Sequence, residues 1–169
     1  MAGTSLTQVN QKLAYCRALL KQLARDGAPG SANERLRQQA LLDGAAFHLL
    51  CAYRHYLREL AENHSIPDVS RITTEQDLMD ALERFGKNPS EARELLTLRT
   101  DPDTWLGALQ EAYDACWAAS GAAPVARIEV LDLESPDGAP GKVTQARLTQ
   151  WFEAFNELVE RQRETSAEY

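Results

Sequence analysis

Apolar residues recur with helical spacing along most of the chain, and the first such stretch covers residues 5–25. About one residue in three or four is apolar there, which places these side chains on one face of a helix; they are Leu6, Val9, Leu13, Cys16, Leu20 and Leu23. Gly27 and Pro29 follow, and both residue types commonly end helices. The pattern predicts a helix that ends just before Gly27.

A second pattern, over residues 31–63, predicts the central helix of the fold. Ser31 and Glu34 have the spacing of a capping box, and Ile66–Pro67 follows the end of the pattern. Phe47 lies off the apolar seam, whose residues are Leu42, Ala46, Leu49, Tyr53, Tyr56 and Leu60. Because apolar residues also flank this seam, we expect several other helices to pack against it.

Two short helices are expected next. The first covers residues 74–85, with four side chains predicted to face inward: Leu78, Met79, Leu82 and Phe85. The second is expected to be capped by Ser90, because serine accepts hydrogen bonds from the free N–H groups at the start of a helix.

Two further long helices complete the predicted set. Asp101–Pro102 combines an N-cap acid with a proline at the first helical position, which predicts a helix that reaches about residue 119. Its apolar row is Trp105, Leu109, Ala112 and Cys116. The last helix is expected over residues 144–165, with an apolar face of Leu148, Trp151, Phe152, Phe155, Leu158 and Val159.

Residues 120–143 break the helical pattern. Glycine and proline lie at both ends of this stretch, and apolar and charged residues alternate near 125–134, which predicts an irregular connection with an extended segment. The sequence as a whole predicts an all-α fold: a single domain over residues 1–169, built as a helical bundle of four long and two short helices. Residues 166–169 are expected to fray.

Composition places the chain among globular proteins. Of its 169 residues 44% are hydrophobic and 25% are charged, which is enough to form a buried core. The sequence has no recognisable secretion signal and no apolar run of membrane-spanning length, so we expect a cytoplasmic protein. Its three cysteines are expected to be reduced. Cys16 and Cys116 are expected to be buried in the apolar rows of their helices, and Cys51 is considered below as a possible metal ligand.

Charge is divided unevenly along a chain whose net charge is −7. Residues 1–60 hold eight Lys/Arg and four Asp/Glu, whereas residues 61–169 hold ten and twenty-one. The asymmetry fits either ordinary solvated helix faces or a basic face for an anionic partner. We expect acids from the second half of the chain to neutralise Arg25, Arg35 and Arg37, and we expect no nucleic-acid binding.

One set of side chains has the types and spacing of metal ligands. His48, Cys51 and His55 lie three and four residues apart and would share one side of a helix. A structural zinc site normally needs four ligands, and no second helix offers a matching set. The alternative is that both histidines pack against a neighbouring helix or lie in solvent, and we therefore predict no metal and no cofactor.

Arg58 and His64 form a second candidate site. An arginine and a histidine that are separated by five residues near the end of a bundle helix are similar to the motif of HEPN-type ribonucleases. That resemblance implies that Arg58 would bind phosphate and His64 would transfer a proton. This sequence departs from the pattern in placing His64 directly before Ile66–Pro67, in acidic surroundings.

Three stretches together resemble an uncharacterised family of small helical proteins from pseudomonads and related proteobacteria. They are residues 47–53 (FHLLCAY), residues 105–117 (WLGALQEAYDACW) and residues 158–163 (LVERQR). Because these motifs are mostly apolar and aromatic, the resemblance implies a packing arrangement and no particular reaction.

The sequence supports three hypotheses of function. The first is a non-enzymatic interaction or adaptor protein, monomeric or homodimeric, whose partner is another protein and neither nucleic acid nor a membrane. The second is the ribonuclease with Arg58 and His64. The third is a small-ligand binder with a pocket lined by Tyr53, Tyr56 and tryptophans. We expect all three tryptophans to be core residues: Trp105, Trp117 and Trp151.

Overall fold

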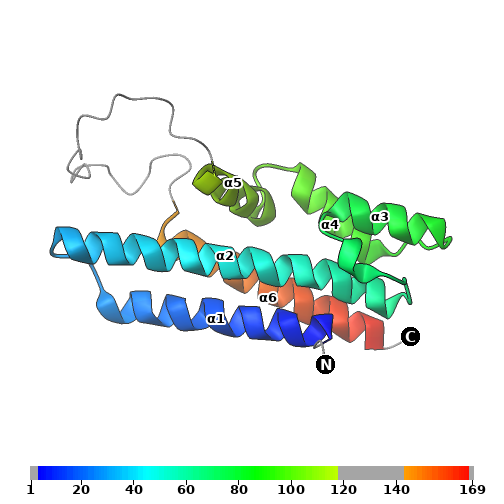
Figure 1. Ribbon diagram of the computed structural model, residues 1–169, viewed down its shortest axis with the longest axis horizontal. Coiled ribbons are helices and arrows are strands. Elements are labelled where there is room, and N and C mark those ends of the chain that lie inside the picture. The colour runs from blue at the N-terminus through cyan, green and yellow to red at the C-terminus, as the bar shows by residue number, and fades with distance from the viewer. Residues whose placement is uncertain (1–3, 118–142, 168–169) are drawn as a thin grey trace.

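The computed structural model describes residues 4–117 and 143–167, and these residues form helices and their connections without a strand. Figure 1 shows α1 (Ser5–Asp26), α2 (Ala32–Asn63), a 3-10 turn η1 (Val69–Arg71), α3 (Glu75–Arg84), α4 (Ser90–Thr100), α5 (Trp105–Trp117) and α6 (Gln145–Ala167). The predicted all-α fold is confirmed. The segment expected to be extended, near 125–134, lies outside the described residues.

The helix α2 is the centre of the fold, as predicted. It contacts α1, α3, α5, α6 and η1, while α6 lies against both α1 and α2 (Figure 1). Tyr53 meets Phe155 and Glu59 meets Arg163, so α6 runs in the same direction as α2. The helix α1 runs antiparallel to both. The bundle therefore has three long helices side by side, with α3 and α5 packed against another side of α2 and α4 packed against both of them.

The turn between α1 and α2 follows the sequence signals closely. Gly27 has a φ of 67°, a left-handed conformation that glycine adopts without strain, and its N–H donates to the carbonyl of Leu23. Ser31 Oγ accepts a hydrogen bond from the N–H of Glu34 at 3.2 Å. The Glu34 carboxylate accepts from the N–H of Gly30 at 2.6 Å, one residue earlier than an ideal capping box requires.

An ion pair closes the same end of the hairpin. Arg37 Nη2 lies 3.1 Å from Asp26 Oδ2, at the last residue of α1. The expectation that acids from the second half of the chain neutralise this end is therefore wrong for Arg37. The acid comes from α1, because an antiparallel hairpin brings its own two ends together.

The two short helices α3 and α4 begin in different ways. Thr74 caps α3 with a full capping box, in which its side chain accepts from Asp77 and the Asp77 carboxylate accepts from the N–H of Thr74. Ser90 was expected to cap α4, but it is the first helical residue and Pro89 is the N-cap. Proline fixes φ at a value that suits a helix start, so α4 begins without a side-chain cap.

The helix α5 starts later than Asp101–Pro102 predicts. Asp101 accepts from the N–H of Asp103 in a turn, and Thr104 Oγ1 then accepts from the N–H of Gly107 at 3.2 Å, so Thr104 is the observed cap. This turn folds back closely on the helix. A Cβ at Gly107 would lie 2.5 Å from the carbonyl oxygen of Asp101, and only glycine fits there without a shift.

The predicted apolar stripes form one continuous core. The seam of α2 and the face of α6 are buried throughout, and in α1 the stripe is buried from Val9 onward. Aromatic rings fill the centre, where Phe155 makes edge contacts with Tyr53 and Tyr56 at centroid distances of 5.9 Å. Trp105 packs against the same ring at 5.7 Å. The expected core role is confirmed for Trp151, whereas Trp105 is partly buried and packs against the core.

Four residues predicted to be buried are exposed in the structure, and they all lie near helix ends: Leu6, Phe85, Cys116 and Trp117. Phe85 follows the last residue of α3 and is 52% exposed. Trp117 ends the described part of α5, beyond its last buried residue, and is 74% exposed. Helical periodicity identifies which face points inward, but it does not show where the neighbouring helix stops.

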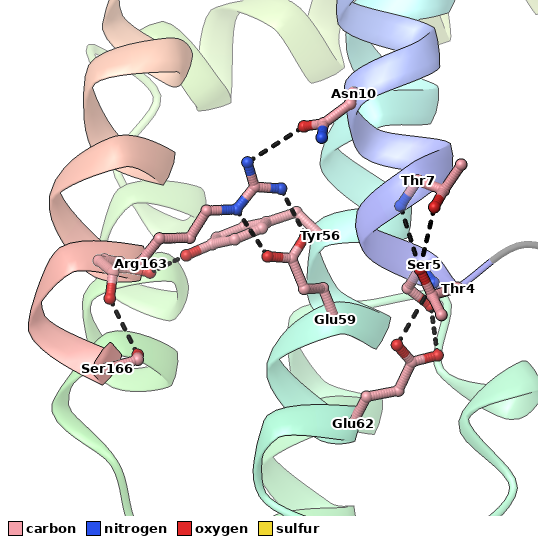
Figure 2. A network of polar contacts seen from close by, with 10 residues as sticks. Thr4, Ser5, Thr7, Asn10, Tyr56, Glu59, Glu62, Arg163 and Ser166 are labelled. Carbon is pink, nitrogen blue, oxygen red and sulfur yellow. Dashed lines mark hydrogen bonds and ion pairs between the residues drawn. The ribbon is translucent and has the colours of Figure 1, made fainter. Parts of the chain in front are cut away.

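A buried ion pair joins α2 to α6, as Figure 2 shows. Glu59 is only 2% exposed, and its carboxylate accepts from Nε and Nη2 of Arg163 at 2.7 and 2.8 Å. Arg163 also donates to Asn10 of α1 at 3.1 Å. The hydrogen bonds to Glu59 raise the pKa of Arg163 above its ordinary value. One arginine therefore connects all three long helices.

Neighbouring polar contacts extend this connection to α4. Tyr56 donates to Gln162 Oε1 at 2.7 Å, and Gln162 Nε2 donates to Glu94 at 2.8 Å. Arg161 pairs with the same carboxylate. Burial alone would raise the pKa of Glu94, but the hydrogen bonds from Arg161 and Gln162 hold it below its ordinary value. The last turns of α6 are thus held by polar contacts from α1, α2 and α4.

We predict that Glu59→Gln destabilises the fold by about 3 kcal/mol, because it leaves the half-buried Arg163 without its counter-charge. Chemical denaturation followed by circular dichroism measures this free energy of unfolding. The matched control is Arg71→Ala, which breaks the exposed pair with Asp68 and should cost less than about 1 kcal/mol. Equal losses in the two variants would contradict the structural role of the buried pair.

We predict that Gly107→Ala destabilises the fold by about 2 kcal/mol, because the added Cβ forces the 101–102 turn away from α5. Alanine is the better helix former by about 1 kcal/mol, so a stabilised variant would show that the turn yields freely. Gly30→Ala is the control. Its Cβ would meet only Glu34 Oε2 at 3.4 Å, and we expect a change within about 0.5 kcal/mol.

Candidate functional site

Arg58 is engaged in holding the connection that follows α2. Its Nε donates to the carbonyl of Ile72 at 2.9 Å, and its Nη2 lies 3.4 Å from the carbonyl of Ser70. His64 is the C-cap of α2, and its own carbonyl accepts a hydrogen bond from Lys87. These contacts give Arg58 a structural role. Its pairing with His64 in a ribonuclease site stays a prediction.

His48, Cys51 and His55 share one side of α2, as their spacing predicts, and each is half-buried. They lie beside α1. Over residues 4–117 and 143–167, no three His, Cys, Asp or Glu side chains are placed to hold one metal ion. The three side chains therefore lie on the same side of α2, but the described residues do not complete a metal site around them.

Exposed aromatic side chains of both α1 and α2 surround His48 instead. Its ring lies 5.2 Å from that of Tyr15 and 5.4 Å from that of Phe47, in edge-on contacts, and both neighbours are 44% exposed. Lys12 Nζ lies 5.6 Å from the centre of the Tyr15 ring. We call this surface the aromatic–histidine face; it consists of Lys12, Tyr15, Leu19, Phe47, His48, Cys51 and His55.

Both histidines of this face are uncharged at neutral pH. Burial lowers the pKa of His48, and the nearby charge of Lys12 lowers it further. Burial also lowers the pKa of His55, together with the charges of Arg58 and Lys12. Because an ordinary histidine has a pKa of about 6.5, a lowered pKa leaves both rings mostly neutral at pH 7. The face therefore presents imidazole rings as weakly polar, flat surfaces.

The charges that act on this face are positive. Burial raises the pKa of Cys51, although the charges of Lys12 and Arg54 oppose the change. With Arg58 beside His55, three cations act on the three central side chains. The thiol stays protonated at neutral pH. The face thus combines exposed aromatic rings with a cationic surround.

The two tyrosines proposed to line a ligand pocket are core residues. Tyr53 donates to the buried carboxylate of Glu75 at 2.7 Å, and Tyr56 is 1% exposed. The rings of Phe155 and Trp105 occupy the space beside them. In the described part of the chain these aromatic side chains fill the interior, so they form packing and not a cavity.

Two shallow hollows lie elsewhere on the surface. The larger, of about 330 Å³, lies between the connection 66–72 and α3, and the exposed Phe85 borders it. Three of its charged groups are already engaged: Asp68 pairs with Arg71 at 2.8 Å, and Asp77 caps α3. The smaller, of about 150 Å³, adjoins the Asp26–Arg37 ion pair. Neither hollow brings together residues of the candidate sites.

The comparison with known families identifies the chain. A model of the family of unknown function DUF6586 matches it from residue 1 to residue 169. The chain belongs to this family. No curated protein and no solved structure matches it. The resemblance of residues 47–53, 105–117 and 158–163 to an uncharacterised helical family is confirmed at this level.

The motifs of this DUF6586 protein have two kinds of position in the fold. Residues 158–163 include Arg163, which forms the buried ion pair, and residues 105–117 pack α5 against the core. Residues 47–53 include both the exposed Phe47 and the buried Tyr53.

Among the helices that the structure describes, none is long and apolar enough to cross a membrane.

Sequence reasoning found the histidines but missed their aromatic neighbours. Tyr15 and Phe47 both lie outside the predicted apolar stripes of their helices. An aromatic residue on the outer side of each of two consecutive helices is the signal that could have found this surface. Their proximity depends on how α1 and α2 are aligned, which the sequence pattern does not give.

We predict three different thiol reactivities. Burial raises the pKa of Cys16 to about 12 against the opposing charge of Arg17, and Cys51 is half-buried, whereas Cys116 is exposed. The expected burial of Cys116 is therefore wrong. Since the thiolate is the reactive form, a thiol reagent at neutral pH should label Cys116 first, Cys51 slowly and Cys16 only after unfolding.

Mass spectrometry of the labelled protein, read at successive times, checks this order. The variant Cys116→Ser should lose the fast phase and keep the slow one. Fast labelling of Cys16 in the folded protein would show that the α1/α2 contact opens readily.

Proposed function

We propose that this DUF6586 protein is a non-enzymatic helical interaction protein that binds another protein through its aromatic–histidine face. The observation that carries the proposal is the exposure of Tyr15 and Phe47 on either side of His48. Aromatic side chains are enriched in protein interfaces, where they supply most of the binding energy. A cluster of them on neighbouring helices is a better interface than aromatics scattered singly.

The fold also holds these side chains ready for binding. The face stands on the two longest consecutive helices, and each ring is held by an edge contact with the next. Side chains that are already ordered lose less entropy when a partner binds. This surface therefore needs no rearrangement to form an interface.

The buried ionisable groups support binding more than catalysis. Glu59 is committed to Arg163, Glu75 to Tyr53, and Arg58 to two backbone carbonyls. Each of these groups completes the packing of one helix on another. In the described residues they do not converge on a common cleft, as the acid and base groups of an active site do.

The proposed setting is the cytosol of a bacterium of the pseudomonad type. The three cysteines are unpaired in the structure, which suits a reducing compartment. A partner would then be another cytosolic protein.

Photo-crosslinking in native cells tests the proposed surface. Benzoylphenylalanine replaces Phe47 in one variant and Phe85 in a control, since both phenylalanines are partly exposed but lie on different helices. We expect a discrete crosslinked protein from position 47 that is absent from position 85. Calorimetry with that purified partner should then show at least about tenfold weaker binding to the double variant Tyr15→Ala/Phe47→Ala.

Two outcomes would contradict the proposal. One is the absence of a specific product at position 47, and the other is unchanged affinity of the double variant. Because both side chains are substantially exposed, the double variant should unfold within about 1 kcal/mol of the wild type. Loss of binding can then be separated from loss of folding.

A further inference from the structure

The α1/α2 pair has two long sides, and α6 covers one of them. Arg17 of α1 lies 5.4 Å from the ring of Phe152, and Asn10 contacts Arg163, so α6 covers that side of both helices. The aromatic–histidine face lies along the other side. In the part of the chain that the structure describes, α1 has extensive contacts with α2 and α6 alone, so no other helix covers this second side of the pair. A fourth helix there would complete a four-helix arrangement.

The face extends far enough for a short helix to bind. It covers Lys12 to Leu19 on α1 and Phe47 to His55 on α2, or about 12 Å at about 1.5 Å per residue. That length matches about two to three turns of a partner helix. An amphipathic helix that binds such a face places its apolar residues three and four positions apart.

The charge of the face decides which helix fits. Lys12, Arg54 and Arg58 act on its central residues. Of the acids of α2 near this face, Glu59 binds Arg163, Glu62 accepts from the N–H and hydroxyl of Ser5 (Figure 2), and the exposed Asp43, one turn before Phe47, accepts from Gln39. Arg58 donates to two backbone carbonyls, but Lys12 and Arg54 form no ion pair among the described residues, so these two cations favour a partner that carries carboxylates.

A second copy of the chain fits this charge poorly. In a two-fold dimer built on the face, each surface meets its own equivalent. Such a dimer brings the cations Lys12 and Arg54 of both copies into one interface, and Asp43 is the one acid of α2 between residues 43 and 58 that could offset them. Nucleic acid is also a poor match, because three cations give too few phosphate contacts for tight binding at physiological salt.

We infer, on the basis of the proposed function, that the partner contributes an acidic amphipathic helix. Its apolar residues pack over Tyr15 and Phe47, and its Asp and Glu residues meet Lys12 and Arg54. Arg54 is exposed, and its guanidinium carbon lies 5.6 Å from the centre of the Tyr113 ring. The binding of such a helix is screened by salt, so its affinity falls as ionic strength rises.

A display selection tests this inference without a known partner. The probe is a library of random peptides of about 16 residues, or about four helical turns, selected on the full-length protein. Selected peptides should be rich in Asp and Glu and carry Leu or aromatic residues three and four positions apart. Raising salt from about 0.05 M to about 0.5 M should weaken their binding about tenfold.

Charge reversal is the decisive comparison. On the double variant Lys12→Glu/Arg54→Glu, the selection should switch from acidic to basic peptides. The matched control is Arg84→Glu/Arg93→Glu, which makes the same change at exposed positions of α3 and α4 and should leave the acidic preference intact. Circular dichroism of each variant shows whether the fold survives the substitutions.

The outcomes separate this inference from the proposed function. Neutral or basic peptides that need Tyr15 and Phe47 would overturn the acidic partner and leave the interaction surface standing. A library that yields no peptide dependent on Tyr15 and Phe47 would overturn both. Two other results would also overturn the acidic partner. One is a dimer in analytical ultracentrifugation that is lost in Phe47→Ala. The other is oligonucleotide binding at about 0.15 M salt that is lost on charge reversal.

Discussion

The rest of the structure depends on one buried carboxylate. Glu59 lies between α2 and α6, about one turn before α2 ends, with almost no contact with water, and an unpaired charge in that position would cost several kcal/mol. Arg163 meets it with two hydrogen bonds and reaches Asn10 with a third nitrogen. A slide of α6 by even one turn would break this geometry. The pair therefore fixes the position of α6 more sharply than the apolar core, which tolerates small shifts.

The placement of α6 determines which surface of the hairpin is free. When Arg163 pairs with Glu59, Phe152 lies near Arg17, and α6 covers one side of the α1/α2 pair. The short helices cover another side of α2, with Arg58 holding the connection to α3. The remaining side carries the aromatic–histidine face. A buried interaction at one side of the bundle thus defines the candidate interface at another.

The sequence predicts the secondary structure well and the contacts between distant residues poorly. Periodicity is a local property, so it gives the inward faces of α1, α2 and α6, and capping residues give most of their ends. It fails for Phe85 and Trp117, because burial there depends on where neighbouring helices end. The pairing of Glu59 with Arg163 joins residues 104 positions apart. The spacing of His48, Cys51 and His55 likewise predicts a shared side, but not the presence of Tyr15 opposite them.

The uneven charge of the chain has its explanation in these contacts. All four acids of the first 60 residues are engaged: Asp26 with Arg37, Glu34 with the backbone of Gly30, Asp43 with Gln39, and Glu59 with Arg163. The arginine in the last of these pairs comes from the acidic half of the chain, which reverses the expected direction of charge matching. Only the contact of Asp26 uses a cation of the hairpin, Arg37, because the other three acids bind neutral groups or an arginine of α6. The positive charge of α1 and α2 is therefore not consumed by the fold, and around the aromatic–histidine face it stays available to a molecule of the opposite sign.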